Sequence, residues 1–347
     1  MISKTGCPGY PQDVTPVELV DRLARASMRY RYRVWGFGEG IAMHGLLHAG
    51  AEPRAFAAEL LRGWTQAGLP LSRDLAAHLA PGVPLLTWYG LSGDGRALDR
   101  AREIAEMLSA TKLGRHGARL HRPDLAGWEN EVWVDCMHLD GPFLVALGRV
   151  LHDAHWIDLG VELLLSHARV LQDERTGLFW HGFDDATGVP NGVLWGRGQG
   201  WALLGLVDTL RELDPAHPGK DEVHQRLAKL VSGLAATEAS LVGRWHTVVD
   251  RPETYLEPSV SAFVALGVGE ATRQRLMDRS AAPLAGRAWQ ATLAGIDRHG
   301  ELVGVSDATP VGADASHYES RATGVFPWGQ GPALLAATQV FAEERST

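Results

Sequence analysis

Apolar residues recur at helical spacing along nearly the whole chain, whereas the Val/Ile/Thr alternation typical of strands is almost absent. Thr15, Pro16 and Glu18 predict a first helix, because a capping hydroxyl, an early proline and an early acid are helix start signals. With weaker patterns included, about a dozen helices are predicted, around residues 19–24, 42–47, 56–61, 84–90, 97–108, 143–151, 157–171, 202–213, 223–234, 260–268, 287–296 and 332–341.

The connections between these predicted helices differ in length. Alternate connections are long and rich in Trp, Gly, His and acidic residues, whereas the others are short. We therefore predict an all-α fold, a closed ring of helical hairpins whose long loops gather at one mouth, where a functional site is expected. Residues 1–14 are predicted to be a flexible tail and residues 15–347 a single domain, with short β hairpins in loops such as 247–249 and 302–305.

Composition argues against several classes of protein. The chain has 347 residues and a net charge of −8, so it lacks the basic excess that would neutralise nucleic-acid phosphates. No run of about 18 apolar residues predicts a membrane span. The N-terminus has no signal-like apolar core, and Cys7 and Cys136 are interpreted as free thiols, so a cytoplasmic location is expected. No HExxH, P-loop or GxSxG motif occurs, and neither a metal nor a nucleotide cofactor is predicted.

One acid stands in an apolar segment. Asp135 lies within Trp133–Leu139, where an ionised carboxylate would lose much of its hydration. Such a setting favours the neutral acid and lets it donate a proton near neutral pH. A helix N-cap or a buried ion pair is the structural alternative, and both remain open at this point.

Several segments combine Trp, Gly and His. Trp faces stack on sugar rings and glycines permit close approach to a ligand, so these segments favour a carbohydrate site. In Trp195–Trp201, Arg197 is expected to pair with a ligand carboxylate or, alternatively, with a loop acid. The glycines there are expected to delay the helix until about Trp201. The candidate site residues are Trp35, Asp135, His138, His181, Trp195, Arg197, Trp201, Trp245, His246 and Trp328.

The order of these segments resembles the unsaturated rhamnogalacturonyl hydrolases, glycoside hydrolase family 105, which are kin to the unsaturated glucuronyl hydrolases of family 88. The resemblance covers about Trp35 to Leu335. It is carried by Trp133-Val-Asp135 with Pro142-Phe-Leu144, by Gly177-Leu-Phe-Trp-His181-Gly-Phe-Asp184, by Trp195-Gly-Arg197-Gly-Gln-Gly-Trp201, by Gly243 to Ser259, and by Pro327-Trp328-Gly329-Gln-Gly331.

The resemblance implies an (α/α)6 barrel and a substrate oligosaccharide that ends in a 4,5-unsaturated uronic acid. In such enzymes one carboxylic acid protonates C4 of the enol ether and then, as a carboxylate, directs water onto C5, rather than using two carboxylates in a displacement. By position Asp135 matches that acid, and His181, Trp195, Arg197 and Trp201 match sugar-contacting positions. The family also has a second aspartate, which has no convincing match in this sequence, since Asp74 and His78 lie only near its position. His138 stands where the family usually has an apolar residue.

Two further functions remain open at this stage. An intact glucuronidase or a sugar epimerase uses the same barrel, and His181 and His246 are the residues an epimerase would need. A carbohydrate-binding protein without catalysis is the third interpretation, supported by the 12 Trp residues alone. The expected partner in every case is an oligosaccharide, and the protein is expected to be a monomer or homodimer.

Overall fold

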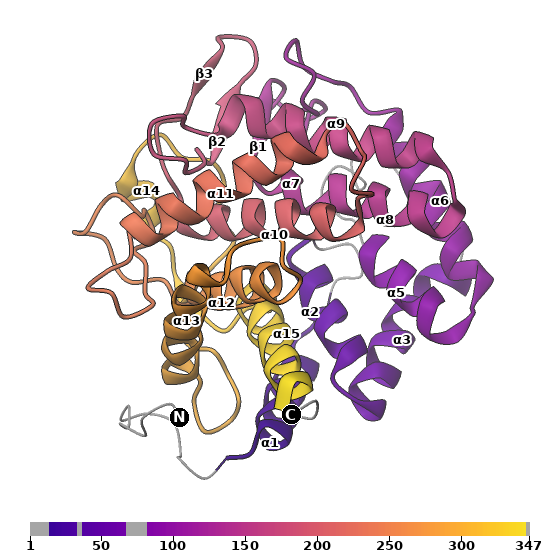
Figure 1. Cartoon of the computed structure of the whole chain (residues 1–347), viewed down its shortest axis with the longest axis vertical. Coiled ribbons are helices and arrows are strands. Elements are labelled where there is room, and N and C mark those ends of the chain that lie inside the picture. The colour runs from indigo at the N-terminus through magenta and orange to yellow at the C-terminus, as the bar shows by residue number, and fades with distance from the viewer. Residues whose placement is uncertain (1–13, 33–36, 67–81, 345–347) are drawn as a thin grey trace.

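Two concentric rings of helices form the body of the molecule (Figure 1). The computed structural model describes residues 14–32, 37–66 and 82–344. Within these residues the inner ring is α2 (Phe37–His48), α5 (Gly82–Ser92), α8 (Gly141–Leu151), α10 (Gly196–Glu212), α12 (Pro258–Arg273) and α15 (Pro327–Glu344), which packs back on α2. The outer ring is α1 (Pro16–Met28), α3 (Ala51–Gln66), α6 (Gly95–Ser109), α9 (Ala154–Leu171), α11 (Lys220–Ala236) and α13 (Ala282–Gly295).

Each outer helix packs against an inner one, which is the architecture of an (α/α)6 barrel. Every helical pattern predicted from the sequence, including the two weaker ones, coincides with one of these helices, although those at 202–213 and 287–296 run one residue past the helix end. At the start of α1, the Thr15 hydroxyl accepts a hydrogen bond from the Glu18 amide at 3.3 Å. The Glu18 carboxylate in turn accepts one from the Thr15 amide at 2.8 Å, so the predicted start is a capping box.

The predicted start of α10 was wrong, because the helix begins at Gly196 rather than near Trp201. Its glycines are sites of close packing. A Cβ at Gly198 would lie 2.8 Å from the Val134 side chain, and one at Gly200 would lie 2.4 Å from the Phe263 ring. A Cβ at Gly205 would lie 2.3 Å from the Met137 carbonyl oxygen. The absence of side chains therefore lets α10 approach its neighbours, and it does not delay the helix.

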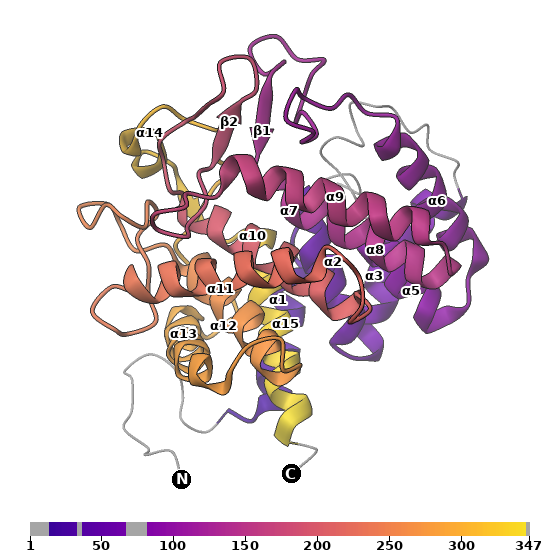
Figure 2. The ribbon, with the colours of Figure 1, turned by 45° about the horizontal axis from the view of Figure 1, so that its top comes forward.

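Short strands lie in the loops at one end of the barrel. β1 (Glu131–Trp133), β2 (Gly182–Asp184) and β3 (Val189–Pro190) form an antiparallel sheet that the sequence did not predict, and Figure 2 shows β1 and β2 above the helices. β4 (Val305–Ser306) pairs with β5 (Thr323–Gly324), so the expected strand at 302–305 is only partly confirmed. The expected strand at 247–249 is wrong, because Val248 makes just an isolated bridge to Trp195.

The starts of several inner helices adjoin at this end. Arg197 at the start of α10 contacts Glu257, the N-cap of α12, and its guanidinium lies over the Trp328 ring in the first turn of α15. A Cβ at Gly38, in the first turn of α2, would meet the same ring. These contacts define the mouth that carries the candidate site.

Three points bear on the remaining predictions about the chain. The predicted tail, residues 1–14, lies outside the described residues except for Val14, and a single domain for 15–347 stays a prediction. Cys136 is a free, buried thiol. Among the described residues, none of the helices combines the length and apolarity that crossing a membrane requires.

We predict that Gly205→Ala destabilises the protein by about 1–3 kcal/mol, because the added methyl group overlaps the Met137 carbonyl and forces α10 away from its neighbour. Gly63→Ala is the matched control. Gly63 lies in α3 with no atom near its added Cβ, so the change should stabilise by about 0.5–1 kcal/mol through helix propensity. Urea unfolding of both variants measures the difference, and equal effects would contradict the packing argument.

Candidate active site

Asp135 lies between β1 and a short helix, α7 (Cys136–Leu139), and its side chain is 2% exposed. It precedes α7 but makes no capping hydrogen bond, so the N-cap alternative does not describe it. Oδ2 of Asp135 lies 3.4 Å from Nε2 of His181, and neither atom has a hydrogen-bond partner within the described residues. No guanidinium or ammonium of the described residues pairs with this carboxyl group.

The β1–β2 register brings His181 to Asp135. Trp133 pairs with Gly182, and the Val134 amide donates to the His181 carbonyl at 3.0 Å, which sets the two side chains on neighbouring backbones. Nδ1 of His181 lies 2.7 Å from the Tyr318 hydroxyl. Burial lowers the pKa of His181, and the neighbouring Asp135 opposes this effect only in part. His181 is therefore a neutral imidazole at neutral pH.

Five of the sequence-predicted residues join in one chain of contacts. The ring centroids of His181 and Trp195 are 4.2 Å apart. The Arg197 guanidinium lies 4.6 Å from the Trp195 ring centroid and 5.6 Å from that of Trp328. The resulting cluster, Asp135–His181–Trp195–Arg197–Trp328, draws on segments spread along more than half of the sequence, and its side chains are buried.

The structure shows what holds the guanidinium of Arg197. One terminal nitrogen donates to the Ser306 carbonyl and hydroxyl at 3.1 and 2.6 Å, and the other donates to the Asp307 carbonyl and the Thr309 hydroxyl at 2.9 and 3.0 Å. Glu257 lies 3.5 Å away. The alternative in which Arg197 pairs with a loop acid matches the Glu257 contact, although its shorter hydrogen bonds go to Ser306, Asp307 and Thr309.

Glu257, whose role the sequence left open, organises the same region. Its carboxylate accepts from the Val260 amide at 3.2 Å, which caps α12, and from the Ser306 amide at 2.9 Å. Trp328 donates its indole N–H to the Ser306 carbonyl at 2.8 Å. The loop that carries Ser306 is therefore fixed from three sides by Arg197, Glu257 and Trp328.

Two predicted residues point elsewhere in the barrel. The His138 ring stacks on Trp201 with centroids 5.2 Å apart, and its Nδ1 lies 3.9 Å from the Asp208 carboxylate. His138 also lines a cavity of about 50 Å³ together with His44 and Arg211. Burial lowers the pKa of His138 and Asp208 counteracts it. The His138 side chain thus contacts groups farther along α10, and its link to Asp135 is through the backbone, where the His138 amide donates to the Asp135 carbonyl at 3.2 Å.

Two other predicted site residues, Trp245 and His246, contact neighbouring segments rather than the cluster. Trp245 is fully buried, and its indole N–H donates to the Leu234 carbonyl at 2.8 Å, so the structure does not bring it to the cluster. His246 is half-buried, and its Nδ1 lies 2.5 Å from the Thr254 carbonyl oxygen. That contact links two positions of one loop and does not bring His246 to the cluster. Trp35, Asp74 and His78 lie outside the described residues.

Sequence reasoning missed two residues of this region. Trp133 was named only as a neighbour of Asp135, yet its ring stacks on His121 with centroids 3.8 Å apart and meets the edge of His181. Tyr318, on α14 (Ala315–Glu319), was not singled out at all. No signal in its own segment points to the site, because its role depends on a contact with a residue far away in the sequence.

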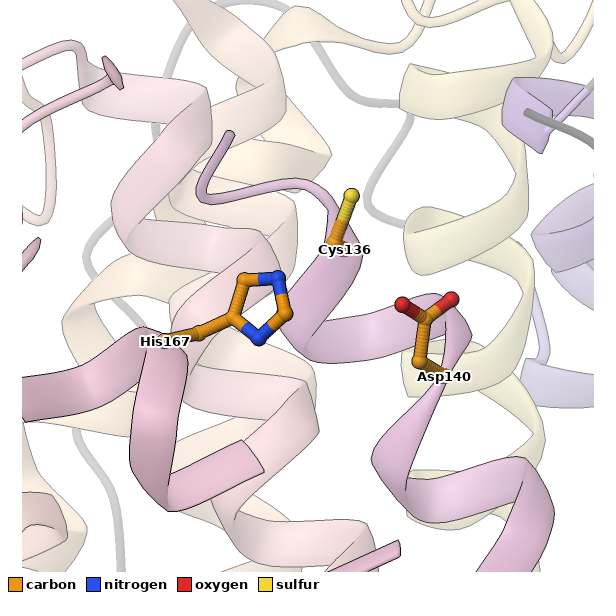
Figure 3. Close-up of side chains that lie close together, drawn as sticks. All are labelled: Cys136, Asp140 and His167. Atoms are coloured by element: carbon orange, nitrogen blue, oxygen red, sulfur yellow. The ribbon is translucent and has the colours of Figure 1, made fainter. Parts of the chain in front are cut away.

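A second cluster of potential ligands lies behind Asp135. Cys136, Asp140 and His167 bring their ligand atoms within 4.8 Å of one another, from α7, from the junction of α7 with α8, and from α9 (Figure 3). The buried Arg119 guanidinium already binds there, with Nε 2.5 Å from Asp140 Oδ2 and Nη2 3.1 Å from Cys136 Sγ. Burial raises the pKa of Cys136 to about 12, so its sulfur is a thiol. This donor set fits a structural ion pair better than a metal, which prefers a thiolate.

Comparisons with known proteins agree with this geometry. The family model described as Glycosyl Hydrolase Family 88 matches residues 24–343. Unsaturated rhamnogalacturonyl hydrolase YesR of Bacillus subtilis (strain 168) is 28% identical over 339 residues, covering 93% of this chain and 94% of the relative. A possible member of the GH105 family from Klebsiella pneumoniae superposes with a TM-score of 0.86 at 21% identity, covering 96% and 95% of the two chains. Unsaturated glucuronyl hydrolase from Bacillus sp. GL1 gives a TM-score of 0.70 at 16% identity, covering 93% and 94%.

An (α/α)6 barrel with a buried acid, an arginine and aromatic rings at one mouth defines a carbohydrate-active enzyme. The chain belongs to glycosyl hydrolase family 88 and is a glycosidase. The predicted barrel and the resemblance to the unsaturated uronyl hydrolases are both confirmed.

We predict that Arg119→Met destabilises the protein by about 3–5 kcal/mol, because it leaves the Asp140 carboxylate buried without its cation. Combining it with Asp140→Leu should recover most of the loss. Arg122→Met is the control, since the Arg122–Asp124 pair is partly exposed and should be worth less than about 1 kcal/mol. Chemical denaturation compares the variants, and no recovery in the double variant would sink this explanation.

Proposed function

We propose that this glycosidase removes a terminal 4,5-unsaturated uronic acid from oligosaccharides left by polysaccharide lyases. The observation that carries the proposal is the state of Asp135, a buried carboxyl group at the barrel mouth that faces a neutral imidazole and no cation. The names of the relatives support the substrate class, since they include an unsaturated rhamnogalacturonyl and an unsaturated glucuronyl hydrolase.

The chemistry needs one group that is first an acid and then a base. C4 of the enol ether is electron-rich, so Asp135 protonates C4 and positive charge develops at C5 and the ring oxygen. The Asp135 carboxylate then accepts a proton from water as that water adds to C5. The hemiketal formed at C5 opens, and the neighbouring sugar leaves.

The surrounding residues have proposed roles in binding. The Arg197 guanidinium lies over the Trp195 and Trp328 rings, and it would place a fixed positive charge near the substrate carboxylate. The assignment of Trp195 and Trp328 to sugar contact comes from the sequence. His181 donates to or accepts from Asp135. Trp35, His138, Trp201, Trp245 and His246 remain proposals from the sequence, and the contacts of Trp245 favour a packing role.

The chain offers less support for an epimerase. Such an enzyme needs two histidines that face one sugar carbon, yet His181 has Nδ1 at the Tyr318 hydroxyl and Nε2 at the Asp135 carboxyl group. Nδ1 is thus engaged by Tyr318, and Nε2 faces a carboxyl group rather than a second histidine. An intact glucuronidase stays the alternative reaction, and the products distinguish it, because only the proposed reaction consumes a double bond.

A cytoplasmic location and a monomeric or dimeric state also remain predictions. The sugar next to the uronate is not assigned, since it contacts loops around the second subsite. Size-exclusion chromatography with light scattering gives the oligomeric state directly.

We predict that the purified protein abolishes the ultraviolet absorbance of unsaturated lyase products, and that Asp135→Asn lowers kcat at least about a hundredfold, because the amide can neither donate to C4 nor accept from water. Asp184→Asn is the matched control. Asp184 is exposed in β2 and accepts from the Ala186 amide, an interaction the Asn side chain retains, so kcat should change less than about twofold. A wild-type protein inert on a broad panel of unsaturated oligosaccharides would refute the function, whereas an active Asp135→Asn variant would refute only the role of Asp135.

A further inference from the structure

We infer that Tyr318 is a positioning residue that fixes His181 as the tautomer protonated on Nε2, so that the Nε2–H faces Oδ2 of Asp135 and leaves Oδ1 to carry the acid proton. The tautomer follows from the contacts of the described residues. Its catalytic consequence rests on the proposed function of Asp135.

Three groups contact the Tyr318 hydroxyl. The Gly312 amide donates to it at 3.1 Å, and the Asn191 side-chain amide lies 3.1 Å away. The third group is Nδ1 of His181 at 2.7 Å, the shortest of the three contacts. A phenolic hydroxyl has one hydrogen to donate, so the roles of the other two groups decide where that hydrogen goes.

The orientation of the Asn191 amide is determined by its other contacts. Its carbonyl oxygen accepts from the Gly182 amide at 3.2 Å and from the Val193 amide at 3.4 Å. Its nitrogen donates to the Gly312 carbonyl at 2.8 Å. A flipped amide would set its N–H groups against two backbone N–H groups and its oxygen against a carbonyl. Asn191 therefore presents its nitrogen, a donor, to Tyr318.

The Tyr318 oxygen thus accepts from Gly312 and Asn191, and its single hydrogen goes to His181 Nδ1. The opposite tautomer would give this oxygen three donors and leave its own hydrogen without an acceptor among the described residues. Burial raises the pKa of Tyr318, so the phenol keeps its hydrogen. Because His181 is neutral, an unprotonated Nδ1 means that Nε2 carries the hydrogen.

This tautomer determines which oxygen of Asp135 carries the proton. With an N–H facing Oδ2 at 3.4 Å, that oxygen is an acceptor whether the acid is neutral or ionised. The proton used in catalysis then resides on Oδ1. In the reaction the Oδ1–H bond breaks and the π electrons of C4=C5 form the new C4–H bond. Water adds to C5 and returns a proton to the carboxylate, so His181 gains and loses none.

The test begins with the tautomer itself. Nitrogen-15 NMR of histidine-labelled wild type should show His181 with a protonated Nε2 and an unprotonated Nδ1, the assignment being made by the resonances that vanish in His181→Gln. In Tyr318→Phe the hydrogen that holds Nδ1 is gone, and we expect its resonance to shift toward the protonated form. A protonated Nδ1 in wild type would overturn the inference.

Kinetics then test the catalytic consequence. Tyr318→Phe should lower kcat about tenfold and leave KM within about twofold, because one positioning hydrogen bond is lost while the sugar contacts remain. In a His181→Gln background, the same change should lower kcat by less than about twofold, since an amide donates through its nitrogen and has no tautomer to lose. Equal losses in the two backgrounds would contradict a role through His181.

Tyr32→Phe is the matched control. The Tyr32 hydroxyl is also buried and has no hydrogen-bond partner among the described residues, so its removal breaks no hydrogen bond to His181 and should leave the His181 resonances and kcat unchanged. A wild type with the expected tautomer but no activity on unsaturated oligosaccharides would refute the proposed function and leave the tautomer assignment standing. An active wild type with a protonated Nδ1 would refute the tautomer assignment and leave the proposed function standing.

Discussion

Two buried carboxyl groups five positions apart in the chain have opposite surroundings, and the account depends on that difference. Asp140 is bound by the buried guanidinium of Arg119, with Nε 2.5 Å from its Oδ2. Asp135 makes no ion pair with a guanidinium or ammonium of the described residues, although Arg197 interacts with it electrostatically; its near neighbour is His181, an imidazole that burial keeps neutral. The Asp135 carboxyl group is therefore open to a ligand, whereas that of Asp140 is committed to its cation.

The barrel supplies what this arrangement needs. The β1–β2 pairing holds His181 beside Asp135, and the glycine positions of α10 let that helix pack close enough to bring Trp195 and Arg197 against them. Arg197 then connects the starts of α10 and α12 to the Ser306 loop. Helix packing, loop hydrogen bonds and the position of the reactive group are thus parts of one arrangement.

The sequence predicted most of the fold, because helical periodicity is a local signal that each segment carries independently. The sequence also singled out Asp135 as a candidate acid, because its apolar neighbours are adjacent in the chain. It could not show that His181 meets Asp135 or that Tyr318 meets His181, since those contacts depend on sheet register and on loops distant in the chain. Trp245 is the opposite case, a residue that the sequence assigned to the site although its contacts lie elsewhere. Its residue type suggested sugar binding, but the direction of its side chain, toward Leu234, is decided by packing.

The most direct test of the central claim is where the new hydrogen is found. Hydrolysis of an unsaturated disaccharide in deuterium oxide, followed by NMR of the released uronate, should show one deuterium at C4 delivered to a single face. Finished product incubated with the enzyme in deuterium oxide measures any later exchange. Release of the neighbouring sugar with no deuterium at C4 would mean that the enol ether is never protonated there, and the account of Asp135 would be wrong.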